Sequence, residues 1–477
     1  MDRPVRVLIV GGGIGGLSLA NMFEKAGIEY IVLEKAVRIR ALGSSLGLDA
    51  SSLPVMEQLG LLQDFYRASK PVRQFNFYNE SLDSIGKVDF SDLEEIGGYP
   101  AIILDRPAFY NILLKNIPKN KILYNKRVLS ITQDQDGATA KCSDGSAYLS
   151  DIVIGADGAY SATRQNIYRA LKEEGNLPAN DCKPLGYNQH CLVGVSDALD
   201  PEQYPILKSD TADFEIVIPQ RDPFYAIYMP LPDNRISWAV IQNVPRSDAL
   251  KGDSFKFSEW GPEAAAEMAN YVRNQPAPFL RTSNTWPTTN RTATEPSDLD
   301  VASYGTLGDI IDNTPKDLIS KILLEEKFFE TWHHGRVVLM GDACHKVVPS
   351  AGLGANLAIL EGVHLCNLIA DLPRPVTALN ITKIFEAYYS QRAKIAKVAL
   401  AKSKQFGKVM GDRGPISRLV RKVFLNHMPD WMARYSNTQR LQHRPQLHFL
   451  AQIPDRGSVK GRPQEERLFG KQHAVNV

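Results

Sequence analysis

The sequence predicts an α/β protein: a doubly wound parallel sheet, interrupted by a largely antiparallel sheet and followed by a helical C-terminal region. Two observations support this prediction. Short apolar runs occur near the start of the chain, near residue 150 and near residue 340, and such runs are typical of parallel strands buried on both faces. Between them, polar and apolar residues alternate over long stretches, which favours antiparallel strands with one covered face.

The chain opens with a strand, a turn, a helix and a second strand. Val5–Val10 is an almost continuous apolar run, and Tyr30–Leu33 is the next one. Between them, Leu17–Ala26 predicts a helix that Gly27 closes at its C-terminal end. These segments form one βαβ unit, whose crossover is right-handed in a parallel sheet.

The later elements are predicted by the same patterns. Alternation predicts antiparallel strands in residues 72–90, and Pro107 suits the first turn of a helix after Ala101–Arg106. Residues 185–245 alternate with period two, and Pro232-Asp233-Asn234 predicts a hairpin turn there. The remaining expected elements are loops and short helices over residues 246–300, buried strands at Asp151–Asp157 and Val337–Met340, and a helix over Leu353–Leu372.

The bulk composition excludes several classes of protein. The 477 residues are 44% hydrophobic and carry a net charge of only +2, so no general attraction to nucleic acid is expected. The five cysteines form no CxxC pair, which favours reduced thiols in an intracellular compartment. The nine histidines show no HExxH spacing, so no metal site is expected. No window is apolar enough for a membrane span or fits a signal peptide, and we expect a soluble, cytoplasmic protein.

The glycine-rich turn after the first strand predicts dinucleotide binding. Gly11, Gly13 and Gly16 match GxGxxG, and Glu34 ends the second strand 18 residues later. In a Rossmann-like unit the first glycine permits the tight turn, the second lets the backbone approach a pyrophosphate, and the third lets helix and strand pack closely. A carboxylate at the position of Glu34 accepts hydrogen bonds from a ribose diol. This motif alone leaves NAD and FAD open.

Two later segments decide between these cofactors through a family resemblance. Gly155-Ala156-Asp157-Gly158, continued to Arg164, resembles the DG motif of class A flavoprotein hydroxylases. Gly335–His345, which contains Gly341-Asp342, resembles their GD motif. Pro349, Gly352, Gly354, Ala355 and Asn356 resemble the loop that contacts the flavin ring in that family. The resemblance covers roughly residues 5–372 and implies FAD as the cofactor, with NAD(P)H as a transient reductant.

Within this group the chain is most similar to fungal FAD-dependent monooxygenases, including epoxidases of meroterpenoid and indole-diterpene pathways. Leu42–Leu48 matches their flavin-contacting loop, and Arg106 matches their FAD-contacting arginine. Several membrane-bound relatives carry C-terminal spanning helices that have no counterpart in this sequence. The cofactor-binding residues that motif and resemblance imply are Gly11, Gly13, Gly16, Glu34, Gly47, Arg106, Asp157, Asp342, Gly354, Ala355 and Asn356.

The resemblance also implies how the chain is divided. Residues 1–70, 101–165 and 331–372 are expected to form the FAD-binding domain. Residues 71–100 and 166–330 are expected to form the substrate sheet and its domain, and residues 373–477 a helical C-terminal region and tail. Asp342 is expected to accept a hydrogen bond from a ribityl or ribose hydroxyl. The helix after Gly352–Asn356 would direct its N–H groups at negative charge on the N1/C2 side of reduced flavin.

The implied activity is a monooxygenation through a flavin C4a-hydroperoxide, either a hydroxylation or an epoxidation of a small organic substrate by O2. The alternatives are a flavin oxidase or reductase of the same fold, and a non-catalytic FAD-binding adaptor. No base for ring hydroxylation is identifiable. Tyr225 and Tyr228 lie on a predicted strand of the substrate sheet, three residues apart, so at most one of them lines the pocket.

Several residues near the motifs have plainer interpretations. Asp157 has the alternative role of capping a turn. His334 and His345 have the alternative role of polar residues beside the site whose hydrogen bonds are satisfied. Cys344 is more typical of a small packed residue than of a nucleophile. The basic stretch Ser417–Leu425 fits an ordinary solvated helix face better than a peripheral membrane contact. The sequence does not predict an oligomeric state.

Overall fold

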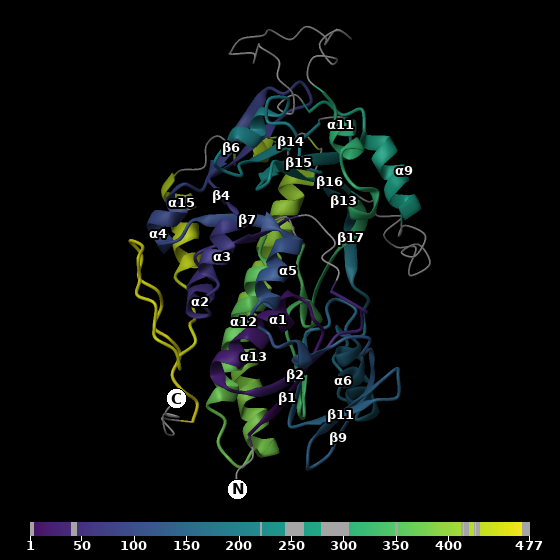
Figure 1. Cartoon of the computed structure of the whole chain (residues 1–477), viewed down its shortest axis with the longest axis vertical. Coiled ribbons are helices and arrows are strands. Elements are labelled where there is room, and N and C mark those ends of the chain that lie inside the picture. Colours follow the sequence, from purple (N-terminus) through teal and green to yellow (C-terminus); the bar gives the residue numbers. More distant parts are fainter. Residues whose placement is uncertain are drawn as a thin grey trace.

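The computed structural model describes residues 4–39, 45–219, 222–243, 262–277, 305–348, 352–411, 414, 419–423, 425 and 430–469. It is elongated (Figure 1), with a parallel sheet and its helices in the lower part of the view and a larger sheet with α9 and α11 in the upper part. Leu42–Ser44, Pro349, most of 246–300 and parts of Ser417–Leu425 lie outside the described residues.

The parallel sheet is assembled from three distant parts of the chain. Its strand order is β18-β19-β12-β1-β2-β8, with β1 parallel to both β12 and β2 and β12 parallel to β19. The strands are β1 (Arg6–Val10), β2 (Glu29–Leu33), β8 (Ile122–Leu123), β12 (Ile152–Gly155), β18 (His333–His334) and β19 (Val337–Leu339). Because parallel strands share a direction, the segments that follow β1, β12 and β19 meet at one edge of this sheet.

Helices α1 (Ile14–Ala26) and α12 (Gly354–Ala370) pack against each other beside this sheet. A Cβ atom added to Gly15 would lie 3.4 Å from the Cβ of Ala358, and Gly362 similarly approaches Met22. The long helix α13 (Ala378–Gly411) packs on α12, and the Tyr388 hydroxyl of α13 donates to the Leu339 carbonyl at 3.2 Å. Thus α12 and α13 pack next to the edge where the three strands end.

The second large sheet has eight strands in the order β20-β17-β13-β16-β15-β14-β5-β6. All its neighbours are antiparallel except β14 and β5. One face is covered by α9 and α11, which share a hydrophobic cluster with it. The elements are β5 (Gln74–Tyr78), β6 (Ser84–Asp89), β13 (Gly186–Val195), β14 (Phe214–Val217), β15 (Phe224–Leu231), β16 (Arg235–Asn243), β17 (Ser320–Phe328), β20 (His345–Lys346), α9 (Pro262–Val272) and α11 (Leu307–Asp312).

Two three-stranded sheets and several short helices complete the described structure. The order β3-β7-β4 links the two large sheets, and β11-β10-β9 forms a meander beside α6. The strands are β3 (Ser45–Leu48), β4 (Lys70–Val72), β7 (Ala101–Asp105), β9 (Val128–Gln133), β10 (Ala138–Cys142) and β11 (Ala147–Ser150). The helices are α2 (Leu53–Gln58), α3 (Leu62–Arg67), α4 (Asp92–Gly97), α5 (Arg106–Leu114), α6 (Ala162–Glu173), α15 (Asp430–Leu441) and the 3₁₀ helices η1 (Lys119–Lys121), η2 (Pro205–Lys208), η4 (Lys316–Leu318) and η5 (Gly341–Ala343).

The sequence-based expectations for the opening unit and the hairpin are confirmed. Helix α1 begins three residues earlier than predicted, because Gly13 is extended (φ −78°, ψ −179°) and serves as its N-cap. At the predicted hairpin turn, Leu231 pairs with Arg235 across the three residues Pro232, Asp233 and Asn234. Asp233 and Asn234 have φ of 59° and 55°, left-handed values that Asp and Asn tolerate better than most residues.

The C-terminal region is only partly helical. After α15, residues 442–469 run as an extended segment, the C-terminal arm, along the outside of α2 and α4 (yellow in Figure 1). The arm is held by contacts such as the Ser458 amide donating to the Glu95 carbonyl at 2.7 Å. Within the described ranges, no helix combines the length and apolar character that crossing a bilayer requires.

Candidate cofactor site

The glycine turn after β1 leaves an open surface at the N-terminus of α1. A Cβ atom on Gly11 (φ 110°) would lie 2.5 Å from the Ala156 carbonyl oxygen, and one on Gly16 would lie 2.2 Å from the Gly11 carbonyl oxygen. A Cβ atom on Gly13 would meet nothing closer than the Ala156 oxygen at 3.9 Å. Gly11 and Gly16 are therefore required for packing within the chain, whereas Gly13 leaves space beside the free N–H groups of the helix.

Glu34 stands at the end of β2, beside this turn. Its Oε2 accepts a hydrogen bond from the Gly12 amide at 2.7 Å, and its Oε1 accepts one from the Ala36 amide at 2.8 Å. A carboxylate offers about four acceptor positions. Glu34 therefore fixes the turn and keeps acceptor capacity for the hydroxyls of a ribose.

The turn after β12 lies against the glycine turn, because Ala156 and Asp157 border Gly11. The Asp157 carboxylate accepts from the Ser161 hydroxyl at 2.5 Å and from the Thr163 amide at 3.0 Å. The plainer interpretation of Asp157, a cap at the start of α6, is thus what the geometry shows. Its predicted contact with the cofactor stays a prediction.

Arg164 joins the DG and GD segments. Its side chain is buried, with Nη1 donating to the Ala343 carbonyl at 2.8 Å and Nη2 to the Ala159 carbonyl at 2.6 Å. The guanidinium lies 3.9 Å from the centre of the Phe329 ring, a cation–π contact. The sequence indicated Arg164 only as part of the motif, and no spacing rule predicts its partner in η5.

Asp342 sits in η5 after β19, with its carboxylate at the edge where the three strands end. It forms an ion pair with Lys346 of β20, four residues later. The Asp342 side chain is 38% exposed, so it is accessible to a ligand. Lys346 is a neighbour that the sequence analysis missed, although its spacing of four residues from Asp342 was readable.

A buried hydrogen bond between a carboxylate and a histidine lies directly behind η5. The Glu361 carboxylate of α12 accepts from the Gly341 amide at 2.7 Å and lies 2.5 Å from Nε2 of His345. Burial opposes ionisation of Glu361, but His345, Arg392 and the Gly341 amide together hold the pKa of this carboxyl below its ordinary value. The pair therefore fixes the GD turn to α12.

The same place brings Cys344, His345 and Glu361 together, with potential ligand atoms within 4.8 Å of one another. Burial raises the pKa of the Cys344 thiol well above its ordinary value, so the sulfur is a neutral thiol whereas metal ligation needs a thiolate. Both Glu361 oxygens are already engaged. The three side chains form a packed hydrogen-bonded group rather than a set of ligands directed at one point.

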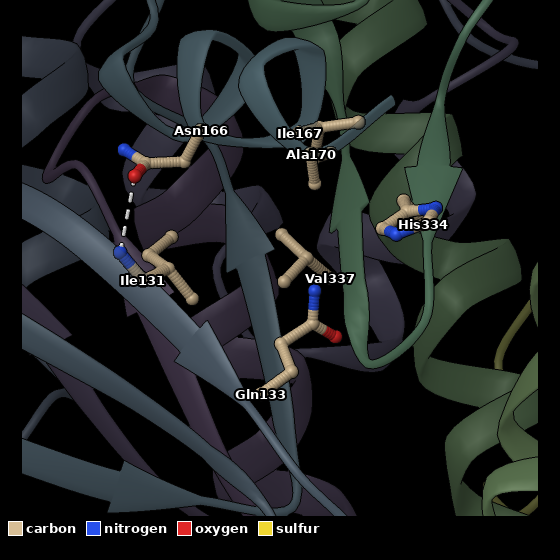
Figure 2. Close-up of a pocket in the computed structure, with 7 residues that line it drawn as sticks. All are labelled: Ile131, Gln133, Asn166, Ile167, Ala170, His334 and Val337. Carbon is tan, nitrogen blue, oxygen red and sulfur yellow. Dashed lines mark hydrogen bonds between the residues drawn. The ribbon is translucent and has the colours of Figure 1, made fainter. Parts of the chain in front are cut away.

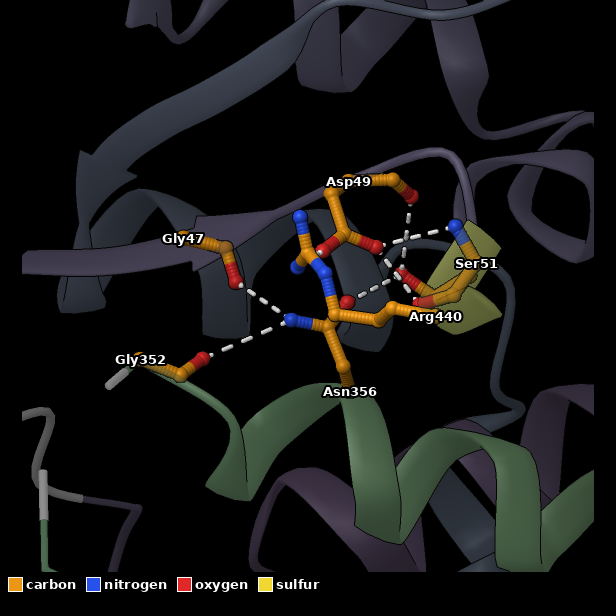
Figure 3. A network of polar contacts seen from close by, with 7 residues as sticks. Gly47, Asp49, Ser51, Gly352, Asn356 and Arg440 are labelled. Atoms are coloured by element: carbon orange, nitrogen blue, oxygen red, sulfur yellow. Dashed lines mark hydrogen bonds and ion pairs between the residues drawn. The ribbon is translucent and has the colours of Figure 1, made fainter. Parts of the chain in front are cut away.

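The segment Gly352–Asn356 leads into α12. Asn356 is buried; its Nδ2 donates to the Gly47 carbonyl of β3 at 3.1 Å, and its Oδ1 accepts from the Ser52 hydroxyl at 2.5 Å. Figure 3 shows Gly47 and Gly352 on the two sides of the Asn356 amide. Two segments that the sequence assigned separately to the flavin ring therefore lie next to each other. Gly354 and Ala355 form the first turn of α12.

Arg106 begins α5, just after β7, which pairs with β3. Its guanidinium lies 5.9 Å from the centre of the Tyr110 ring. Arg106 forms no ion pair with any residue in the described part of the chain. A partly buried guanidinium at this position suits a phosphate or a ring carbonyl.

Tyr225 and Tyr228 point to opposite faces of β15, as predicted. Tyr228 belongs to the cluster that includes α9 and α11, whereas Tyr225 packs with Val348 and Met410 on the other face. That second face also contacts β7 of the smaller linking sheet. Tyr228 therefore faces α9 and α11, and the predicted pocket role stays a prediction for Tyr225 alone.

A cavity of about 200 Å³ lies between the meander, α6 and β19 (Figure 2). It is near Val337 at the beginning of β19, whereas η5 follows the end of that strand. The Asn166 side chain in its wall already accepts from the Ile131 amide at 3.1 Å, and His334 pairs with Glu174 at 3.2 Å. This cavity is separate from the candidate cofactor site.

Fold and site together define a dinucleotide-binding oxidoreductase, in which a parallel-sheet domain carries a covering antiparallel sheet. The family description "FAD binding domain" matches residues 4–182 and 271–403. The chain is 31% identical to the FAD-dependent monooxygenase paxM of Penicillium paxilli, over 77% of this chain and 70% of that protein. It is 29% identical to the FAD-dependent monooxygenase ausM of Penicillium brasilianum, over 84% of this chain and 78% of that protein.

The fold also matches a solved structure. HpxO of Klebsiella pneumoniae, in complex with FAD and uric acid, superposes with a TM-score of 0.70 at 18% identity, over 92% of this chain and 97% of the other. The chain belongs to the FAD-dependent monooxygenase family. FAD is its cofactor, and the open turn at Gly13, the carboxylate of Glu34 and the backbone N–H groups at the start of α12 fit that molecule.

Proposed function

We propose that the protein is a monooxygenase that uses NAD(P)H and O2 to oxidise a lipophilic small molecule, and that it epoxidises an alkene. The observation that carries this proposal is the apolar face of the eight-stranded sheet on the side of Tyr225. Similarity to the fungal monooxygenases supports the reaction type, and this face supports the substrate class.

The pairing register gives the residues of this face. Across the three central strands, Cys191 lies opposite Ile241, and Ile241 lies opposite Tyr225. The other positions on the same face of these strands are Val193, Val195, Ile227, Met229, Leu231, Ala239, Ser237, Gln189, Asn243 and Arg235. The four polar members are two amides, a hydroxyl and the guanidinium of Arg235. The Gln189 amide donates to Asn243 at 3.0 Å, and Arg235, at the end of the face, is paired with Asp105 at 2.6 Å. A face of this composition favours an apolar ligand.

The same face argues against ring hydroxylation of a phenol. That reaction needs a base within hydrogen-bond reach of the phenol, and these positions of the three strands carry no carboxylate, histidine or lysine. The nearby carboxylate of Asp105 is engaged by Arg235. Burial raises the pKa of Cys191 to about 12, so its thiol is no base at neutral pH. Epoxidation needs mainly a well-positioned alkene and exclusion of water, which apolar walls provide.

We further propose roles for the cofactor residues. Gly11, Gly13 and Gly16 would hold the pyrophosphate at α1, and Glu34 the ribose. Asp342 would bind a ribityl hydroxyl. When bound, FAD supplies the electron transfer from NAD(P)H to O2. The backbone N–H groups at the start of α12 would stabilise negative charge on the ring. The remaining proposed contacts are Gly47, Arg106, Asp157, Gly354, Ala355 and Asn356.

The test is oxygen incorporation by the purified holoenzyme. The enzyme would be given NADPH and ¹⁸O2 with a prenylated aromatic compound, and with the matched compound whose prenyl double bond is saturated. We expect one ¹⁸O atom in an epoxide of the first compound and no product from the second. Hydroxylation of the ring in both compounds would contradict epoxidation. If hydrogen peroxide forms and the substrate is oxidised, but the organic product contains no ¹⁸O, the enzyme is instead an oxidase.

A further inference from the structure

Helix α15 reaches the cofactor region through one side chain. Arg440, in its last turn, forms an ion pair with Asp49. Asp49 follows β3 and is 9% exposed, whereas Arg440 is 31% exposed. α15 lies outside the segments that match the FAD-binding family description. A side chain from the C-terminal region therefore contacts a buried carboxylate directly after the strand that carries Gly47.

Asp49 organises the turn that it begins. Its other oxygen, Oδ1, accepts from the Ser51 amide at 2.9 Å and from the Ser51 hydroxyl at 2.5 Å. The Asp49 carbonyl accepts from the amides of Ser52 and Leu53, both at 3.0 Å. One carboxylate thus accepts hydrogen bonds from Ser51 on one side and the Arg440 guanidinium on the other. We call residues 49–52 the Asp49–Ser52 turn.

Ser52 of this turn is hydrogen-bonded to Asn356. The Ser52 hydroxyl donates to Oδ1 of Asn356 at 2.5 Å, and this bond leaves the Asn356 Nδ2 directed at the Gly47 and Gly352 carbonyls, at 3.1 and 3.5 Å. Figure 3 shows Arg440, the turn and Asn356 as one continuous network above the first turn of α12. All members except Arg440 and the two glycines are buried.

Other contacts hold α15 in place independently of Arg440. Arg434 forms two hydrogen bonds with the Glu95 carboxylate, at 3.0 and 2.6 Å. Leu441 is buried against Gly97 of α4. Arg440 is therefore not needed to dock the helix, and its contact with Asp49 serves another purpose.

We propose that Arg440 is a positioning residue, which holds Asn356 and the first turn of α12 in place through the Asp49–Ser52 turn. The proposal rests on the proposed function in one respect, that the Gly352–Asn356 segment faces the flavin ring. Arg440 then affects the affinity for FAD and the midpoint potential of the flavin ring, without touching the cofactor. This gives the C-terminal region a role in the electronic properties of the site.

The test compares variants by the properties of bound flavin. Arg440→Met removes the charge, Ser52→Ala removes one oxygen atom at the centre of the network, and Arg434→Met is the matched control on the same helix. The FAD dissociation constant, the visible circular dichroism and the midpoint potential would be measured. We expect about tenfold weaker FAD binding and an altered spectrum in the first two variants, the size of effect of one partly buried ion pair.

Arg440→Lys should restore most of the FAD affinity, and Arg434→Met should bind flavin as the wild type does while losing some thermal stability. If Arg440→Met and Arg434→Met are alike in all three flavin readouts, Arg440 is merely structural and the proposal is wrong. A spectral change in Arg440→Met that Ser52→Ala does not reproduce would also overturn it. None of these readouts needs a substrate, so an enzyme inactive on every alkene would count against the proposed function only.

Discussion

At the scale of single residues, Gly13 and Gly16 differ in what surrounds them although they are three residues apart. A methyl group on Gly16 would collide with the Gly11 carbonyl, whereas one on Gly13 would enter open space. Any residue can also adopt the extended backbone conformation of Gly13 (φ −78°). Gly16 is therefore required by the packing of the chain itself, whereas a substitution at Gly13 would affect only a ligand bound beside it.

We therefore expect Gly13→Ala to fold as the wild type does and to lose FAD affinity by at least about tenfold, because the new methyl group fills the space for the pyrophosphate. Flavin titration of the apoprotein and thermal unfolding without flavin measure the two effects. Gly16→Ala is the comparison, and it should lower the stability of the apoprotein itself. Unchanged FAD binding in Gly13→Ala would show that the pyrophosphate lies elsewhere.

The residues that sequence could and could not predict differ in where their partners come from. Gly11, Gly13, Gly16 and Glu34 lie within one βαβ unit, so spacing along the chain predicts that they lie close together. Arg440 reaches Asp49 across 391 positions of sequence, and no local pattern records such a contact. The Glu361–His345 pair was missed for a related reason: tertiary packing, rather than helical periodicity, decides which α12 residue lies behind η5.

At the scale of elements, the alternation of β15 determines which side chains face the cofactor region. Tyr225 and Tyr228 are both buried, yet they belong to clusters on opposite faces of the sheet. The period of two predicted this from sequence. It did not predict which helices cover each face. Helices α9 and α11 cover the face of Tyr228, and Met410 of α13 packs on the face of Tyr225; all three helices come from distant segments.

The matched variants Tyr225→Leu and Tyr228→Leu use this difference. Both should lower the free energy of unfolding by about 1–3 kcal/mol, since each removes a buried ring. Only Tyr225→Leu should change kcat/KM, or the position of oxygen insertion, for an alkene substrate. Steady-state kinetics and product analysis at a temperature where both variants are folded would check this. A larger kinetic effect from Tyr228→Leu would contradict the assignment of the faces.

A second element-scale feature is the stacked pair of His364 on α12 and His443 after α15, whose ring centres are 5.8 Å apart. Arg392 of α13 donates to Nε2 of His443 at 2.8 Å. Burial, with the nearby Arg392 and Arg462 charges, lowers the pKa of His443 to about 4. Burial and the same Arg392 also lower the pKa of His364. Both rings are therefore neutral in the folded protein at pH 7.

The sign of the pH dependence follows from these lowered pKa values. Unfolded histidine takes up a proton near pH 6.5, whereas folded His443 resists until about pH 4, so acid favours the unfolded chain. Because His443 is protonated more readily in the unfolded chain, we expect it to lower the free energy of unfolding by about 2 kcal/mol between pH 7 and pH 5. Urea unfolding at both pH values would show the loss, and His443→Gln, which keeps an acceptor for Arg392, should show a smaller one. An equal loss in both proteins would contradict this origin.

At the scale of the whole molecule, the C-terminal arm joins elements that are distant in sequence. Arg444 is buried, with Nη1 donating to the Gly97 carbonyl at 2.7 Å and Nη2 to the Val459 carbonyl at 2.5 Å. Arg456 adds an ion pair with Glu57 of α2. The sequence predicted a helical region followed by a tail. It did not predict the path of the arm, because hydrogen bonds to distant backbone groups leave no periodic pattern.

Arg444→Met should release this arm while the two large sheets stay folded. The variant keeps most of the apolar bulk and loses both hydrogen bonds to backbone, which leaves the Gly97 carbonyl unpaired. Limited proteolysis with mass spectrometry should show faster cleavage within residues 442–469. Arg456→Met, at the more exposed contact, should be cut at a rate closer to the wild type. Equal resistance of Arg444→Met and the wild type would show that the arm is held by its other contacts.

The assembly of the parallel sheet from three separated stretches of chain has a consequence for biosynthesis. β1 emerges from the ribosome first, but β19 is translated more than 300 residues later, roughly 15–65 s later at about 5–20 residues per second. Throughout that interval the nascent polypeptide has its first glycines and no Asp342 or α12. The flavin can be captured only after β19 and α12 have been translated, so the supply of FAD matters after that point and not earlier.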